Sequence, residues 1–386
     1  MNNRRSPEWY DFIQLPSEVK RRSLEMWGLT RAMQGKGRLT GYIELKLTAC
    51  SPIHIGTGNL DLTEDTSFQG GSLVKAIARI NGEPVIPATS LKGALRSNYE
   101  AITYSCLGPI KTSAIEKFHP FDFKKSELPK WVVNKLPPDL RKRGGRVRME
   151  VAFEDLKERL FCRLEKSNVE SSKVCPACAL FGTEGLQGRV WFEDASVTCF
   201  KRDDTPLQVN SMYQPRLHKV GSLRIVKSGR RPKVQAYQLK GRKAYYRVRW
   251  GAVKTNFRRS SPLDYLAVGT YLQTKLYFRN LIPAELGGTI VALGITPKSD
   301  FAFPFRTGGG KPLGLGVLGV HLEKVNLITD DVIWLDFDAS PHEAAHAVTD
   351  PIIIDWILAF TKDAGLFYQD GLRQLHRVTS HPYVGG

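Results

Sequence analysis

The order of strand and helix patterns constrains the fold of this chain more than any other feature. Apolar and polar residues alternate over residues 41–50, as in a strand with one buried face. From Ser90 to Ile102 apolar side chains recur every three or four residues, which predicts a helix capped by Thr89 or Ser90. The first half of the chain therefore begins with a strand, a loop and a helix.

Residues 189–200 have the pattern of a further strand. The second half repeats the order of strand, helix and strand: residues 271–282 have the pattern of a strand, residues 283–296 form a helix pattern with proline in first place, and residues 317–325 alternate again. A strand, helix and strand repeated in this way indicate an α+β protein of the split βαβ type. We expect a ferredoxin-like or modified RNA-recognition (RRM-like) fold with large insertions.

The segments between these elements suggest a division into five parts. The expected parts are an N-terminal extension (1–40) with a helix near residues 17–26, the first half of the core (41–204) with an inserted segment at about 107–180, a basic insertion (205–262), the second half of the core (263–330), and a C-terminal helical extension (331–386).

Charge points to a polyanionic partner. The chain has 56 Lys and Arg against 38 Asp and Glu, a net charge of +18. No acidic residue lies between Asp204 and Asp264, whereas fifteen Lys and Arg lie from Arg216 to Arg259 with aromatic residues among them. Cations neutralise phosphates and aromatic rings stack on unpaired bases, so this stretch suits a single-stranded nucleic acid. A solvated hairpin with one aromatic face is the alternative.

The cysteines suggest a metal site. No apolar run is long enough to cross a membrane and the N-terminus lacks a signal-peptide core, so we expect a cytoplasmic protein without a membrane partner. Thiols in that compartment are reduced or bind metal. Cys175 and Cys178 have the spacing of a zinc knuckle, and Cys106 with His119 would complete a structural Zn²⁺ site. Plain buried thiols are the alternative.

The glycine-rich stretch FRTGGGKPLGLGVLGV, residues 305–320, resembles two nucleotide-binding motifs and fits neither. Pro312 stands where a P-loop needs Ser or Thr, and a strand pattern follows where a dinucleotide fingerprint needs a helix. A glycine turn beside Arg306 and Lys311 still lets a phosphate backbone approach the main chain. Ser90, with basic residues around the predicted helix start, offers a second phosphate-binding feature.

A rival reading comes from HEAAH, residues 342–346. On a helix, His342 and His346 would share one face and bind zinc, with Glu343 as the general base of a metalloprotease. No further Glu follows as a third ligand, and prolines flank the segment. A capped surface helix is the preferred prediction there.

Four motifs occur in one order: SPIHIGTG, PVIPATSLKGALRS, CPACALFG before GRVWFEDA, and GGGKPLGLG. Together, over about residues 41–325, they resemble the RAMP superfamily of CRISPR-associated proteins, specifically the backbone subunits of type III effector complexes. The resemblance implies a subunit that binds CRISPR RNA and target RNA alongside other RAMP subunits and the large signalling subunit. The residues expected to contact RNA are His54, Lys75, Ser90, Lys92, Arg96, Arg230, Arg231, Arg242, Lys243, Arg306 and Lys311.

Some members of that family cut target RNA with an Asp in the loop after the first strand, aided by Mg²⁺ or another divalent ion. Counting forward from the SPIHIGTG motif assigns this role to Asp65, with Asp61 as second choice. Counting backward from Gly82 places Ser72 there instead, which would make the subunit a non-catalytic RNA-binding one. We favour the forward count, because insertions are tolerated more easily in the glycine-containing stretch before Ser72.

Overall fold

The computed structural model describes most of the chain. The residues described are 10–29, 37–62, 73–107, 119–124, 130–134, 138, 146–153, 162, 164, 171–199, 207–210, 221–227, 233–239, 241–248, 260–296, 302–328 and 345–380. Arg230, Arg231, Asp65 and Ser72 lie outside them. No helix of these described parts is long and apolar enough to cross a membrane.

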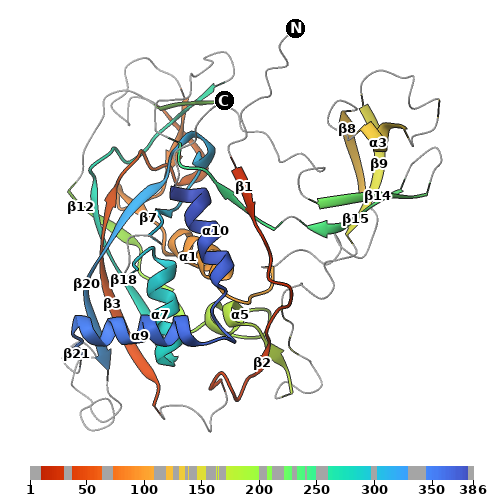
Figure 1. The fold of residues 1–386 in the computed structure, drawn as a ribbon. Coiled ribbons are helices and arrows are strands. Elements are labelled where there is room, and N and C mark those ends of the chain that lie inside the picture. Colours follow the sequence, from red (N-terminus) through yellow and green to blue (C-terminus); the bar gives the residue numbers. More distant parts are fainter. Residues whose placement is uncertain are drawn as a thin grey trace.

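Four antiparallel strands form the centre of the main sheet and confirm the predicted fold (Figure 1). When the four strands are numbered along the chain, their order across the sheet is fourth, first, third and second. This is the ferredoxin-like arrangement. Two helices, α1 after the first strand and α7 after the third, complete it. In chain order these elements are β3 (Leu39–Ala49), α1 (Ala88–Ile102), β12 (Ala195–Cys199), β18 (Tyr271–Leu281), α7 (Pro283–Ala292) and β20 (Val317–Ile328).

Short strands extend this sheet to nine strands. They are β6 (Arg79–Ile80), β7 (Glu83–Ile86), β11 (Val190–Phe192), β19 (Phe305–Arg306) and β21 (Ala345–Ala347).

The alternation along β3 and β18 decides which face of the sheet is covered. Ile43, Leu45 and Leu47 are fully buried and so are Leu272 and Leu276, which lie on the same face. Helices α1 and α7 pack together there, and α9 (Asp350–Lys362) packs on α7 while α10 (Gln369–Ser380) packs on α1. The core therefore lies between one face of the sheet and four helices (Figure 1).

Two four-stranded sheets accompany the main one. The first contains β4 (Gly56–Leu62), β5 (Leu73–Ile77), β13 (Leu207–Asn210) and β17 (Ser260–Leu263). The second combines β8 (His119–Lys124) and β9 (Arg146–Phe153) with β14 (Gly221–Lys227) and β15 (Lys233–Leu239), with α3 (Lys130–Asn134) drawn beside it in Figure 1. Strands from the two predicted insertions thus join in one sheet.

The N-terminal residues form strands rather than the helix expected near residues 17–26, so that prediction is wrong. Strand β1 (Tyr10–Ile13) pairs with β16 (Arg242–Tyr245), and β2 (Arg22–Ser23) pairs with β10 (Lys173–Val174). Trp27 follows in a turn, is fully buried, and donates a hydrogen bond from Nε1 to the Val174 carbonyl at 2.8 Å. Tertiary contacts of this kind outweigh a weak helical pattern.

Candidate nucleic-acid interface and metal centre

Three segments far apart in sequence meet at one end of the main sheet. The glycine loop, residues 307–316 between β19 and β20, contacts the SPIHIG loop through bonds from Gly309 N to the His54 carbonyl and from Gly316 N to the Pro52 carbonyl, each 2.9 Å. At its other side Thr307 Oγ1 donates to the Ser90 carbonyl at the start of α1. Three of the motifs quoted above therefore line one site.

The glycine loop needs its glycines. Gly308, Gly310, Gly314 and Gly316 all have φ between 71° and 87°, a region that side chains disfavour. A Cβ at Gly316 would lie 2.0 Å from the Thr307 carbonyl oxygen. The main chain is consequently close-packed here, and Gly308 and Gly309 are the half-buried glycines of the loop.

The start of α1 differs from its prediction. The helix begins at Ala88 with Pro87 as its N-cap residue, and neither Thr89 nor Ser90 caps it. The cap comes from a distant residue instead, because Asp194 Oδ1 accepts a 2.6 Å hydrogen bond from Ala88 N. The helix N-terminus thus lies beside the glycine loop without a side-chain cap of its own.

Arg306 is the central cation of this site. It is 8% exposed, and its Nη1 donates to the carbonyls of Tyr245 and Tyr246 at 3.1 and 3.0 Å. Its Nε and Nη2 are buried and have no hydrogen-bond partner within the described structure. Burial, together with nearby Arg247, lowers the pKa of Arg306 to about 10. A guanidinium with two unused donors is costly to bury unless an anion joins it.

Lys311 adds to the positive charge beside Arg306, whereas the Lys92 ammonium lies near Gly188 and Arg96. Burial lowers the pKa of Lys311, with Arg306 as a second cause, and burial lowers the pKa of Lys92, with Arg96 as a second cause. Among the described residues, neither lysine has a carboxylate within salt-bridge distance. Lys75 is exposed on β5. Burial, with the charge of Lys75 as a further cause, lowers the pKa of His54. A site with more positive than negative side chains beside a glycine-rich main chain is suited to binding a phosphate group.

The other predicted RNA contacts lie elsewhere. Arg96 donates to Glu100 at 2.8 Å, and Arg242 donates to the other oxygen of Glu100 at 2.7 Å and to the Cys106 carbonyl at 2.6 Å. Both arginines therefore hold the protein together. Lys243 lies over the rings of Tyr10 and Tyr245, at 4.6 and 4.5 Å from their centroids.

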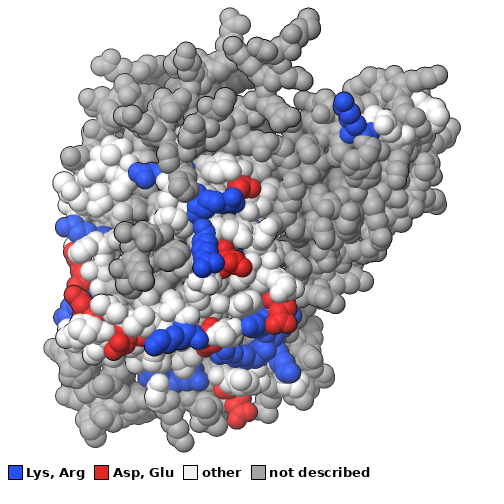
Figure 2. Space-filling view, viewed as in Figure 1, with Lys and Arg blue, Asp and Glu red and all other residues white. Residues whose placement is uncertain are grey.

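The surface over α9 and α10 has a different character. Figure 2 shows Lys and Arg beside Asp and Glu across this face. Pairs such as Arg373 with Asp370 and Arg377 with Asp11 account for part of the pattern. The described part of this face therefore lacks the one-sided charge of the glycine loop.

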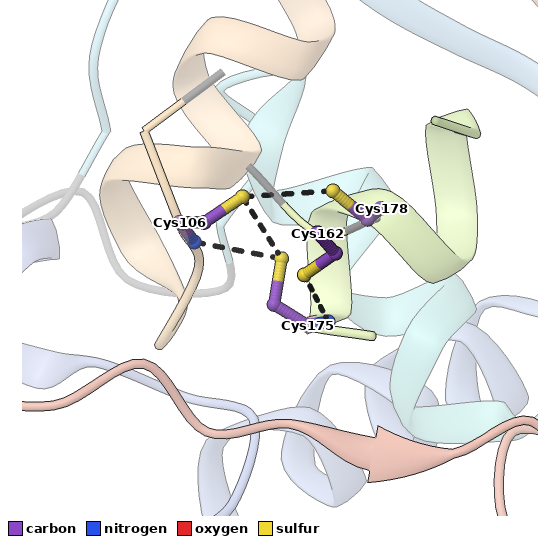
Figure 3. A group of neighbouring side chains, drawn as sticks. All are labelled: Cys106, Cys162, Cys175 and Cys178. Carbon is purple, nitrogen blue, oxygen red and sulfur yellow. Dashed lines mark hydrogen bonds between the residues drawn. The ribbon is translucent and has the colours of Figure 1, made fainter. Parts of the chain in front are cut away.

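Four buried cysteines form the second site (Figure 3). Cys106 follows α1, and Cys175 and Cys178 lie at the start of α5 (Pro176–Phe181). Cys106 Sγ lies 3.4 Å from the sulfur of Cys175 and 3.5 Å from that of Cys178, and all four sulfurs lie within 4.8 Å of one another. The fourth is Cys162, whose sulfur accepts a hydrogen bond from Cys175 N.

This geometry fits one tetrahedral ion. Sulfurs at about 2.3 Å from a zinc ion are separated by about 3.8 Å, close to the distances here. Hydrogen bonds from Cys106 lower the pKa of Cys162, whereas hydrogen bonding to Cys162 raises the pKa of Cys106. Without an ion the protons are thus shared unequally among the thiols, whereas a bound cation would favour the thiolate form of all four. The cluster can hold a metal ion.

The fourth ligand was wrongly predicted. Cys162 occupies the place expected for His119, which lies on β8 in a different sheet. The sequence carried a signal that was missed, because Cys162 belongs to the same inserted segment as Cys175 and Cys178. Arg21 was also missed: it hydrogen-bonds the Cys162 thiol, which raises the pKa of Arg21 against the lowering by burial.

The HEAAH reading is wrong as well. His346 lies in β21, which pairs antiparallel with β20 and places His346 opposite Leu327. A strand turns successive side chains to opposite faces, so it does not supply the helical pair that a metalloprotease requires. His342 and Glu343 lie outside the described residues. The predicted surface helix fails for the same reason.

Asp61 is the described member of the predicted catalytic pair. It lies in β4 opposite Val74, in a strand that ends at Leu62, three residues before Asp65 in the sequence. Among the described residues, the four cysteines are the one group of three or more metal-ligand side chains.

The fold and the glycine-loop site define a ferredoxin-like protein with a buried cation beside a glycine-rich loop. A family model of the RAMP superfamily matches residues 46–318. The chain belongs to the RAMP superfamily, whose members are generally CRISPR-associated RNA-binding proteins. No curated protein matches the chain significantly.

Proposed function

We propose that the chain is an RNA-binding backbone subunit of a type III CRISPR effector complex and that its glycine-loop site holds the phosphate backbone of CRISPR RNA. The observation that carries this proposal is Arg306, buried with two donors that lack partners. A phosphate oxygen accepts such donors in a fork geometry. The negative charge of the phosphate would also offset the charge of Lys311, which lies near Arg306.

The wider proposal follows from this role. Backbone subunits of type III complexes contact target RNA, other RAMP subunits and the large signalling subunit in the cytoplasm. The basic residues between Arg216 and Arg259 would extend the contact along the guide.

Titrating purified protein into single-stranded RNA over a salt series tests the binding site. Lys311→Met should lower affinity and reduce the slope of log K against log salt by about 0.7, the value for one lost phosphate contact on a single strand. Lys362→Met is the matched control, because Lys362 is exposed at the far end of α9. A wild-type protein that ignores RNA, or equal slopes for both variants, would contradict the proposal.

For the cysteine cluster we propose Zn²⁺. Four sulfurs without a nitrogen or oxygen donor suit a closed structural site, and no fifth position is offered to substrate. Its role would be to fix the inserted segment against the end of α1.

For catalysis we propose that Asp65, with Asp61 as second choice, supports Mg²⁺-dependent cutting of bound target RNA. The support is the resemblance together with the closeness in sequence of Asp65 to the end of β4 at Leu62. The alternative is a non-catalytic subunit with Ser72 in the corresponding position.

The pattern of target-RNA products from assembled complexes distinguishes a catalytic subunit from a non-catalytic one. In complexes carrying Asp65→Ala or Asp61→Ala, one product band should disappear while guide binding persists. The conservative control is Asp370→Ala, an exposed carboxylate on α10. If every band survives in both loop variants, the subunit is structural.

A further inference from the structure

His54 has a fixed tautomer. Its Nδ1 lies 2.7 Å from the Asp264 carbonyl oxygen, and a carbonyl can only accept, so Nδ1 carries the hydrogen. Burial, with Lys75 as a further cause, lowers the pKa of His54 despite the opposing effect of Asp264. The ring is therefore neutral at pH 7, and Nε2 presents a bare lone pair.

The Nε2 edge of the ring faces glycines. A Cβ at Gly56 would lie 2.9 Å from Nε2, and a Cβ at Gly309 would lie 3.7 Å from Cδ2 of the same edge. Neither glycine covers the ring with a side chain. Within the described residues Nε2 makes no hydrogen bond, so the acceptor nitrogen of the ring is unused. Gly309 belongs to the loop that also carries Lys311.

The chemistry of this edge selects its ligand. Phosphate and ring oxygens of a nucleic-acid backbone are acceptors and cannot donate to a bare Nε2. The 2′-hydroxyl is the one donor that the sugar-phosphate backbone within an RNA strand offers, and DNA lacks it.

We propose that His54 Nε2 accepts a hydrogen bond from a ribose 2′-hydroxyl of the bound strand and that this contact makes the glycine-loop site prefer RNA to DNA. The inference rests on the proposed function, because it needs a strand held at Arg306 and Lys311. The cations of the site recognise phosphate, which RNA and DNA share. His54 would add a contact that distinguishes ribose from deoxyribose.

The test compares single-stranded RNA with a 2′-fluoro RNA of the same sequence. Fluorine keeps an RNA-like sugar pucker but removes the donor hydrogen. Wild-type protein should bind the RNA about fivefold more tightly, the typical contribution of one hydrogen bond. In His54→Phe, which keeps a ring of similar size without an acceptor, the two affinities should become equal. His54→Gln, which retains an acceptor near Nε2, should keep part of the preference.

His321→Phe is the matched control, because His321 is exposed on β20. Equal binding of the two strands by the wild type overturns the inference even if His54→Phe fails to fold. A preference that persists in a folded His54→Phe overturns it too. Failure of the wild type to bind either strand contradicts the proposed function instead.

Discussion

Two buried arginines in this molecule have opposite surroundings. Arg189 is 3% exposed and donates to the Ala179 and Asn280 carbonyls and to both oxygens of Glu285, which is itself fully buried. Arg306 is 8% exposed and donates from Nη1 alone, with no carboxylate beside it in the described structure. The donors of the first arginine are paired within the fold, whereas two donors of the second have no partner in the described structure. Burial alone therefore does not distinguish the two arginines, but the pairing of their donors does.

Among the sites whose groups are paired within the fold, the cysteine cluster should give the largest loss of stability when it is changed. Cys175→Ser combined with Cys178→Ser should remove about one Zn²⁺ per chain and cost several kcal/mol, because metal binding and folding are coupled in such sites. Metal analysis and thermal unfolding measure both changes. Cys50→Ser with Cys199→Ser is the control, since both thiols are exposed. A wild type free of metal would contradict the prediction.

Removing the counter-charge of Arg189 should cause the second largest loss of stability. Glu285→Gln keeps the shape of the side chain but leaves Arg189 buried without its counter-charge, so we expect a loss of about 3–5 kcal/mol in the free energy of unfolding. Urea unfolding measures it. Asp370→Asn, in an exposed pair with Arg373, should change it by less than about 1 kcal/mol. Similar values for the two variants would remove the contrast between the regions.

The basic insertion should contribute less, and to RNA affinity alone. Arg230→Glu with Arg231→Glu should weaken guide binding by a similar factor for every sequence, because phosphate contacts position a strand without reading its bases. Fluorescence anisotropy with two unrelated sequences measures this. Arg242 is left intact, since it holds Glu100 and the Cys106 carbonyl. Unchanged affinity would show that this insertion does not hold the guide.

The sequence predicted the main sheet and its two helices well, because alternation and helical periodicity follow from one-sided burial. It failed where partners come from distant segments. Asp194 accepts the hydrogen bond that caps α1. His346 lies in a strand because that segment pairs with β20. Trp27 lies in a turn where its Nε1 donates to the Val174 carbonyl. The spacing of Cys175 and Cys178 likewise identified that pair, but it could not distinguish Cys162 from His119, because the fold of the intervening chain decides which side chain reaches the cluster.

The same limit applies to the glycine-loop site. The motifs indicated Arg306 and Lys311 as cations, but only the fold reveals that Arg306 is buried with unused donors. It also shows that Arg96 and Arg242 are bound to Glu100 inside the protein.

The unfolding of Arg306→Met, measured in urea with and without single-stranded RNA, tests the central claim most directly. Without RNA the variant should lie within about 1 kcal/mol of the wild type, because the lost bonds to two carbonyls are offset by removal of a buried unpaired charge. RNA should stabilise the wild type through binding to the folded state and stabilise the variant much less. A variant that loses about 3–5 kcal/mol, as expected for Glu285→Gln, yet gains as much from RNA as the wild type would contradict the account.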